Sequence, residues 1–129
     1  MGQVQKIAVV GAGIGGLAAA LALRKIGAEV TVLEQAPELT EIGAGLQISS
    51  NGLVVLRALG VVPQESGGVG LRSEGTVIRD FRAGRQITVM PPPSAGPTYY
   101  FHRADLVALL QEAAQAALAR GVPVGSGGS

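Results

Sequence analysis

The sequence predicts an α/β fold that opens with two parallel strands joined by a helix, and three consecutive segments predict it. Residues Val4–Val10 are mostly apolar and β-branched, as in a strand buried on both faces, and they end at glycine. Residues Leu17–Ile26 are rich in Ala and Leu, and Glu29–Glu34 is a second β-branched run. The order strand, helix, strand with short connections requires a right-handed parallel crossover.

The connections around this helix support it. Residues Gly11–Gly16 form a glycine-rich turn between the first strand and the helix. Arg24 and Lys25 stand in the last helical turn, where positive charge complements the helix dipole, and Gly27 is at a natural position for the C-cap. The turn and the cap thus predict where the helix begins and ends.

The middle of the chain is less regular. Residues 37–45 are expected to form a loop, and residues 51–59 have apolar side chains at helical spacing. The segment 67–89 mixes β-branched residues with a turn glycine, which predicts two or three short antiparallel strands. The three prolines at 91–93 predict a rigid extended loop.

The last part of the chain predicts a second strong helix at residues 103–119, with its leucines and alanines close to one face. Residues 122–124 begin a third predicted strand. We therefore expect one globular domain over residues 1–124. Residues 125–129 read Gly-Ser-Gly-Gly-Ser, a flexible composition typical of an engineered linker, with a natural low-complexity tail as the alternative.

Composition limits the possible functions. The chain has 129 residues, which suits one domain, and its net charge of +1 gives no electrostatic basis for binding nucleic acid or an anionic membrane. It has no cysteine, so disulfides and thiolate chemistry are excluded, and a cytoplasmic location is expected. No stretch approaches the length of a transmembrane helix.

The glycine-rich turn reads Gly11-Ala12-Gly13-Ile14-Gly15-Gly16, between a strand and a helix as the Rossmann dinucleotide-binding motif requires. In that motif the first glycine permits the tight turn, Gly13 leaves room for a pyrophosphate, and Gly16 lets the helix lie close to the strand. Free N–H groups at the helix N-terminus would point at the phosphates, helped by the helix dipole. The turn therefore predicts a dinucleotide ligand.

Glu34 supplies the second part of this predicted site. It stands at the end of the second strand, where a carboxylate accepts hydrogen bonds from ribose hydroxyls and repels a 2′-phosphate, so NADP is disfavoured. The alternative is a glycine-rich βα turn beside a surface glutamate with no ligand. His102 is the one histidine, and with no carboxylate or cysteine cluster beside it a metal or catalytic role is disfavoured. Arg103 could simply pair with Asp105, and the aromatic residues 99–101 could pack in the core or line a flat ring.

Three stretches together resemble one family. Residues 7–35, residues 42–60 and the sequence His102-Arg103-Ala104-Asp105-Leu106 resemble the class A FAD-dependent aromatic hydroxylases of the salicylate and 3-hydroxybenzoate 6-hydroxylase kind. The resemblance implies that FAD is the cofactor, that Gln47 lies near the ribityl chain and flavin, and that Arg103 reaches the FAD phosphate or ribityl region. The cofactor-binding residues expected in all are Gly11, Gly13, Ile14, Gly15, Gly16, Glu34, Gln35, Gln47 and Arg103.

Family members of this kind are much longer, so the resemblance implies that residues 1–124 are an incomplete, N-terminal FAD-binding part. In the full-length proteins NAD(P)H reduces the flavin and a phenolic acid is hydroxylated. Three functions stay open: a flavin-binding fragment or mini-flavoprotein, a hydroxylase whose remainder lies on another segment or chain, and a scaffold without cofactor. We expect little hydroxylase activity from this chain alone. We also expect a homodimer, because Val4–Val10 would form an unpaired sheet edge.

Overall fold

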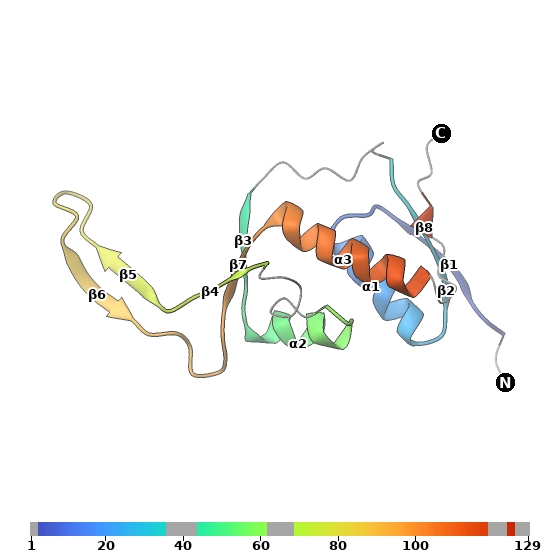
Figure 1. The fold of residues 1–129 in the computed structure, drawn as a ribbon, viewed down its shortest axis with the longest axis horizontal. Coiled ribbons are helices and arrows are strands. Elements are labelled where there is room, and N and C mark those ends of the chain that lie inside the picture. Colours follow the sequence, from blue (N-terminus) through green and yellow to red (C-terminus); the bar gives the residue numbers. More distant parts are fainter. Residues whose placement is uncertain (1–2, 36–43, 62–68, 119–123, 126–129) are drawn as a thin grey trace.

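The computed structural model of the chain describes residues 3–35, 44–61, 69–118 and 124–125. Its first sheet has the order β1-β2-β8, and neighbouring strands in it are parallel (Figure 1). The strands β1 and β2 are joined by helix α1, which confirms the predicted βαβ unit. The bounds are Lys6–Val10 for β1, Ile14–Lys25 for α1, Glu29–Leu33 for β2 and Val124–Gly125 for β8.

One face of this sheet carries the core. Val30 and Val32 of β2 are 0% exposed, and Ile7 and Val9, which lie opposite them in the register, pack against the same cluster. Helix α1 contacts both β1 and β2, and it also lies along α3 (Figure 1). Every second residue of β1 and β2, beginning at Ile7 and Val30, therefore points toward these helices.

The other face of the sheet is open among the described residues. Ala8, Val10 and Glu29 are exposed there, and Val10 is 84% exposed. The expectation that the first strand is buried on both faces is therefore wrong. A strand can read as continuously apolar in sequence and still have only one face covered, because the covering layer is supplied by other elements.

A second, antiparallel sheet has the order β3-β7-β4. Of the expected loop at 37–45, positions 37–43 lie outside the described residues, and Gly45 belongs to a strand that the sequence did not reveal. The strand β7 was not predicted either. Burial alternates along β7: Tyr99 and Phe101 are buried and Tyr100 is exposed. Two of the three neighbouring aromatic residues therefore pack in the core. The bounds are Gly45–Ile48 for β3, Leu71–Arg72 for β4 and Tyr99–His102 for β7.

The strands β5 (Thr76–Arg79) and β6 (Gln86–Met90) form a hairpin that extends away from the rest of the chain (Figure 1). Every residue in both strands is exposed. Together with β4, this confirms the predicted short antiparallel strands; positions 67–68 lie outside the described residues.

The remaining helices agree with the prediction. Helix α2 spans Ser50–Ala58 and α3 spans Arg103–Leu118, while position 119 lies outside the described residues. Leu106 and Leu110 of α3 are 0% exposed and form the centre of the core with Leu17 of α1. The third predicted strand is described at Val124–Gly125, so the first residue of the expected linker pairs with β2.

Candidate functional site

The glycine turn lies at the carboxyl ends of β1 and β2. Gly11 has φ +100°, a backbone conformation that side chains other than glycine rarely adopt. Its N–H donates to the carbonyl of Leu33 over 2.7 Å, which ties the turn to the end of β2. The tight turn predicted at Gly11 is therefore confirmed.

Gly16 lies where α1 crosses closest to the turn. A Cβ built at this position would be 1.9 Å from the carbonyl oxygen of Gly11 and 3.6 Å from a methyl group of Val9. No side chain fits such a distance to backbone. The prediction that Gly16 lets the helix lie close to the strand is confirmed.

Gly13 and Gly15 differ from these two glycines. A Cβ built at either one would meet no atom within 4 Å, and neither has a positive φ. The backbone at Gly13 suits any residue, with φ −79° and ψ −170°, so a side chain there would not strain it. No contact within the described part of the chain requires glycine at these two positions, so the space beside them is open to a ligand there.

The first turn of α1 offers donors beside that space. Gly13 is the N-cap, no side chain caps the helix there, and no acidic residue lies in its first turn. The first helical hydrogen bond runs from the N–H of Leu17 to the carbonyl of Gly13, at 3.0 Å. The N–H groups of Ile14, Gly15 and Gly16 therefore have no partner one helical turn back, and the positive end of the dipole lies among them. This arrangement suits an anion.

Glu34 is half-buried and directly follows β2. Its Oε2 accepts a hydrogen bond of 2.6 Å from the N–H of Ala12, inside the glycine turn. Its Oε1 accepts one of 2.8 Å from the N–H of Gln35. The carboxylate is thus adjacent to the turn. The sequence did not reveal the partner role of Ala12, because a backbone donor leaves no mark on residue type.

Gln47 and Arg103 belong to a second group. Gln47 is an exposed residue of β3 opposite Tyr100, and Arg103 opens α3 with its N–H donating to the carbonyl of Ala44 over 2.9 Å. The pairing of β3 with β7 places Gln47 on one strand of this sheet and Arg103 directly after the other. The hydrogen bonds of this group run between β3, β7 and α3, whereas those of the first group join the glycine turn to the end of β2.

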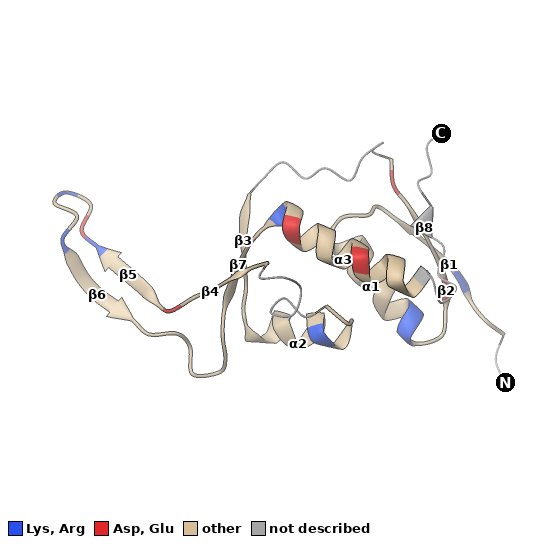
Figure 2. Cartoon of the chain, viewed as in Figure 1, with Lys and Arg blue, Asp and Glu red and all other residues tan. Residues whose placement is uncertain are grey.

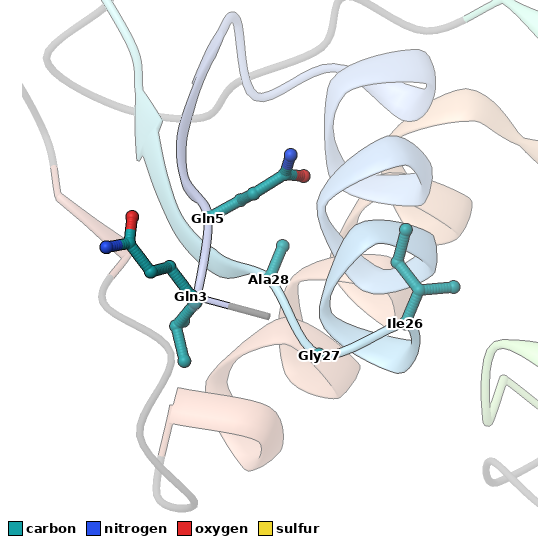
Figure 3. Close-up of a pocket in the computed structure, with 6 residues that line it drawn as sticks. Gln3, Gln5, Ile26, Gly27 and Ala28 are labelled. Atoms are coloured by element: carbon teal, nitrogen blue, oxygen red, sulfur yellow. The ribbon is translucent and has the colours of Figure 1, made fainter. Parts of the chain in front are cut away.

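Other cavities of the described part offer less chemistry. A cavity of about 240 Å³ at the amino end of β1 is lined by Gln3, Val4, Gln5 and residues 26–28, with no titratable side chain (Figure 3). A second cavity lies between helix C-termini, where Lys25 donates to the carbonyl of Ala58 and so satisfies a helix end.

Charges and possible metal ligands are scattered over the described residues. Basic and acidic residues are both distributed over the first sheet, the helices and the hairpin (Figure 2). Within the same residues, no three His, Asp or Glu side chains gather as a metal site would need. None of the described helices is long and apolar enough to cross a membrane.

Comparison with known proteins agrees with this geometry. Residues 9–54 match a family model described as an NAD(P)-binding Rossmann-like domain. The chain is 39% identical over 107 residues to the 3-amino-4-hydroxybenzoate 2-monooxygenase of Streptomyces cremeus, covering 78% of this chain and 27% of that protein. It is 40% identical over 115 residues to the 3-hydroxybenzoate 6-hydroxylase of Polaromonas naphthalenivorans, covering 84% and 28%.

The solved structures give the same result. The tetrameric form of 2-methyl-3-hydroxypyridine-5-carboxylic acid oxygenase superimposes with a TM-score of 0.76 at 26% identity, over 97% of this chain and 32% of that one. Fold and turn together define a Rossmann-like dinucleotide-binding chain. Within that class, the chain corresponds to the N-terminal FAD-binding region of the FAD-dependent aromatic monooxygenases, and it spans somewhat more than a quarter of the length of the curated relatives that it matches.

Proposed function

We propose that this chain binds FAD, with the ADP half of the cofactor on the βαβ unit. The observation that carries the proposal is the open space over Gly13 and Gly15, at an uncapped helix N-terminus and next to the Glu34 carboxylate. The pyrophosphate would accept hydrogen bonds from the first N–H groups of α1, which include those of Ile14 and Gly15. The adenosine ribose would donate to Glu34, close to Gln35.

The flavin half requires other residues. We propose that Gln47 and Arg103 hold the ribityl chain or the phosphate nearest to it, as the family resemblance implies. Their common neighbourhood beside β3 and β7 supports a shared role. A guanidinium is a strong donor to phosphate oxygens. The tricyclic ring system itself supplies the redox chemistry when FAD is bound.

Calorimetry with three ligands tests the proposal. FAD and ADP should bind, and FMN should not, because FMN lacks the pyrophosphate and adenosine that the βαβ unit recognises. Yellow colour with a flavin absorption spectrum in the purified protein would support the same conclusion. Equal affinity for FMN and FAD would exclude this placement of the cofactor, and no binding of FAD or ADP would favour a scaffold without cofactor.

Three variants separate the halves of the site. Glu34→Ala should weaken FAD and ADP to the same degree, because both ligands carry the adenosine ribose. Arg103→Ala and Gln47→Ala should weaken FAD more than ADP, because ADP has no ribityl chain and shares with FAD only the phosphate nearest to it. An equal loss of ADP affinity in Arg103→Ala would contradict the assignment of Arg103 to the flavin half.

For the chemistry, we propose that these 129 residues bind cofactor with little or no coupled hydroxylation. An open sheet face and an exposed hairpin leave few described elements to exclude water from a bound flavin. NADH oxidation that yields hydrogen peroxide, without hydroxylation of salicylate or a hydroxybenzoate, is the expected result. Efficient coupled hydroxylation of a phenolic acid by this chain would contradict the proposal. It would favour the alternative of a working NAD(P)H-dependent monooxygenase.

We propose self-association through β1 as well. Among the described strands β1 lies at the edge of its sheet, and it has no proline to block pairing with a second copy. Light scattering should show a dimer, and Ala8→Lys, which adds a charge on the exposed face of β1, should shift it to monomer. A clean monomer of the unaltered chain at micromolar concentration would contradict the proposal.

A further inference from the structure

The Glu34 carboxylate connects two parts of the chain that are distant in sequence. Its Oε2 lies 2.6 Å from the N of Ala12, between the first two glycines of the turn. Its Oε1 lies 2.8 Å from the N of Gln35 in its own segment. The carboxylate thus joins the end of β2 to the turn, in addition to the backbone bond from Gly11 to Leu33.

This connection matters because Ala12 is buried. The residue is 2% exposed, so its N–H is shielded from water. If the carboxylate were removed, this buried N–H would be left without a hydrogen-bond acceptor. The neighbours Gly11 and Gly13 have no side chains that could hold the turn by packing. Besides the packing of the Ala12 side chain in the core and the bond from Gly11 to Leu33, the hydrogen bond to Glu34 is a further contact that determines where the turn lies.

We infer that Glu34 is a positioning residue, which fixes the glycine turn for a pyrophosphate before any cofactor arrives. The inference deepens the proposed FAD site, and its consequence for ligands rests on that proposal. It assigns Glu34 a task separate from accepting ribose hydroxyls. The carboxylate holds the glycine turn that would bind the pyrophosphate, although Glu34 itself would contact only the ribose.

One carboxylate can perform both tasks. Each ionised oxygen has two lone pairs, so Oε2 and Oε1 can keep the N–H groups of Ala12 and Gln35 and still accept from ribose. A glutamine at this position has a single acceptor oxygen, and its other terminal atom is a donor. In Glu34→Gln the single oxygen can still accept from the buried Ala12, so Glu34→Ala, which removes both acceptor oxygens, is the variant that tests the bond to Ala12.

Amide hydrogen exchange in the ligand-free protein tests the inference. In Glu34→Ala the exchange of the Ala12 amide should accelerate about tenfold to a hundredfold, the loss expected when a hydrogen bond to a charged acceptor is removed. The amide of Val61, which donates to Leu56 over 2.8 Å at the end of α2, serves as the reference outside the glycine turn. Glu29→Ala, the same substitution at the other end of β2, is the matched control and should leave Ala12 unchanged.

Inorganic pyrophosphate provides the second measurement, because it has no ribose and does not need Glu34 as an acceptor. Removing a negative charge near the turn would by itself strengthen pyrophosphate binding. Weaker pyrophosphate binding in Glu34→Ala, measured directly by calorimetry, would therefore report a misplaced turn. Glu29→Ala should bind pyrophosphate as the unaltered chain does.

The outcomes distinguish this inference from the proposed function. Unchanged exchange at Ala12 relative to Val61, or unchanged or tighter pyrophosphate binding, would overturn the positioning role even if FAD binds. Accelerated exchange at Ala12 in a chain that binds neither FAD nor ADP would support the positioning role and refute the proposed cofactor site.

Discussion

The βαβ unit and the β5–β6 hairpin each join two strands through a connection that contains glycine, but different interactions hold them. In the βαβ unit, Val30 and Val32 are fully buried, and the turn is tied to Glu34, 22 residues from Ala12. In the hairpin, every strand residue is exposed. One unit depends on packing and on a distant partner, and the other on local hydrogen bonds.

The hairpin turn is built from neighbours in sequence. The N–H groups of Arg82 and Ala83 both donate to Oδ1 of Asp80 over 2.8 Å, and Gly84 has the positive φ of +67°. Such a turn needs only a few consecutive residues. The comparison teaches that two connections that both contain glycine can differ in their sensitivity to changes elsewhere in the chain.

The largest effect should come from Gly16→Ala. The new Cβ would lie 1.9 Å from the carbonyl oxygen of Gly11, so α1 must move off the sheet. We expect a loss of about 3 kcal/mol in the free energy of unfolding, at the upper end for overpacking. Thermal unfolding followed by circular dichroism measures it, and Gly15→Ala, whose Cβ meets nothing within 4 Å, is the matched control. A stable Gly16→Ala variant would contradict the tight crossing.

Gly13→Val should act on the ligand and not on the fold. The backbone at Gly13 suits valine, and the open space there accepts the side chain in the free protein. The same side chain would occupy the volume proposed for the pyrophosphate. We expect FAD affinity to fall at least about a hundredfold, or about 2.7 kcal/mol, with little change in the melting temperature. Normal FAD binding by the folded variant would show that the phosphates lie elsewhere.

Glu34→Ala should weaken FAD less than Gly13→Val. Losing hydrogen bonds to a charged acceptor should cost about 1.5–3 kcal/mol, roughly tenfold to a hundredfold in affinity. From the sequence alone Glu34 is expected at a solvent-exposed strand end, with no effect on stability. That expectation changes, because the half-buried carboxylate holds Ala12, and a modest loss of stability should accompany the loss of binding. Calorimetry and thermal unfolding of the same sample measure both, and an unchanged affinity would mean that the ribose is bound by other groups.

The smallest effect concerns pH at the hairpin. Hydrogen bonds from the N–H groups of Ala83 and Arg82 lower the pKa of Asp80 below its usual value. Because the folded pKa is the lower one, the carboxylate stabilises the turn above the unfolded pKa, and this contribution is lost as pH falls through the folded pKa. As pH falls below about 4, the ordinary range of carboxyl groups, the protection of the Arg82 and Ala83 amides relative to their intrinsic exchange rates at the same pH should decrease. Asp80→Asn should remove this pH response while the melting temperature of the βαβ core stays the same.

Much of the fold follows from sequence, and the parts that do not follow have a common cause. The glycine spacing, the Ala- and Leu-rich helix and the β-branched runs predict the βαβ unit with bounds close to those observed. The strands β3 and β7 were missed because they are short and pair with each other across a long separation. A four-residue run carries too weak a periodic signal to reveal a partner that far away.

The amino-acid sequence by itself determined the glycines at 11 and 16, since a positive φ and a helix packed against backbone leave no room for a side chain. It also determined that a carboxylate stands at the end of β2. Only the tertiary structure decided that this carboxylate holds the Ala12 N–H, and that one face of β1 is open. Backbone donors are the same in every residue but proline, and the cover of a sheet comes from distant elements, so neither is written in the local pattern of residue types.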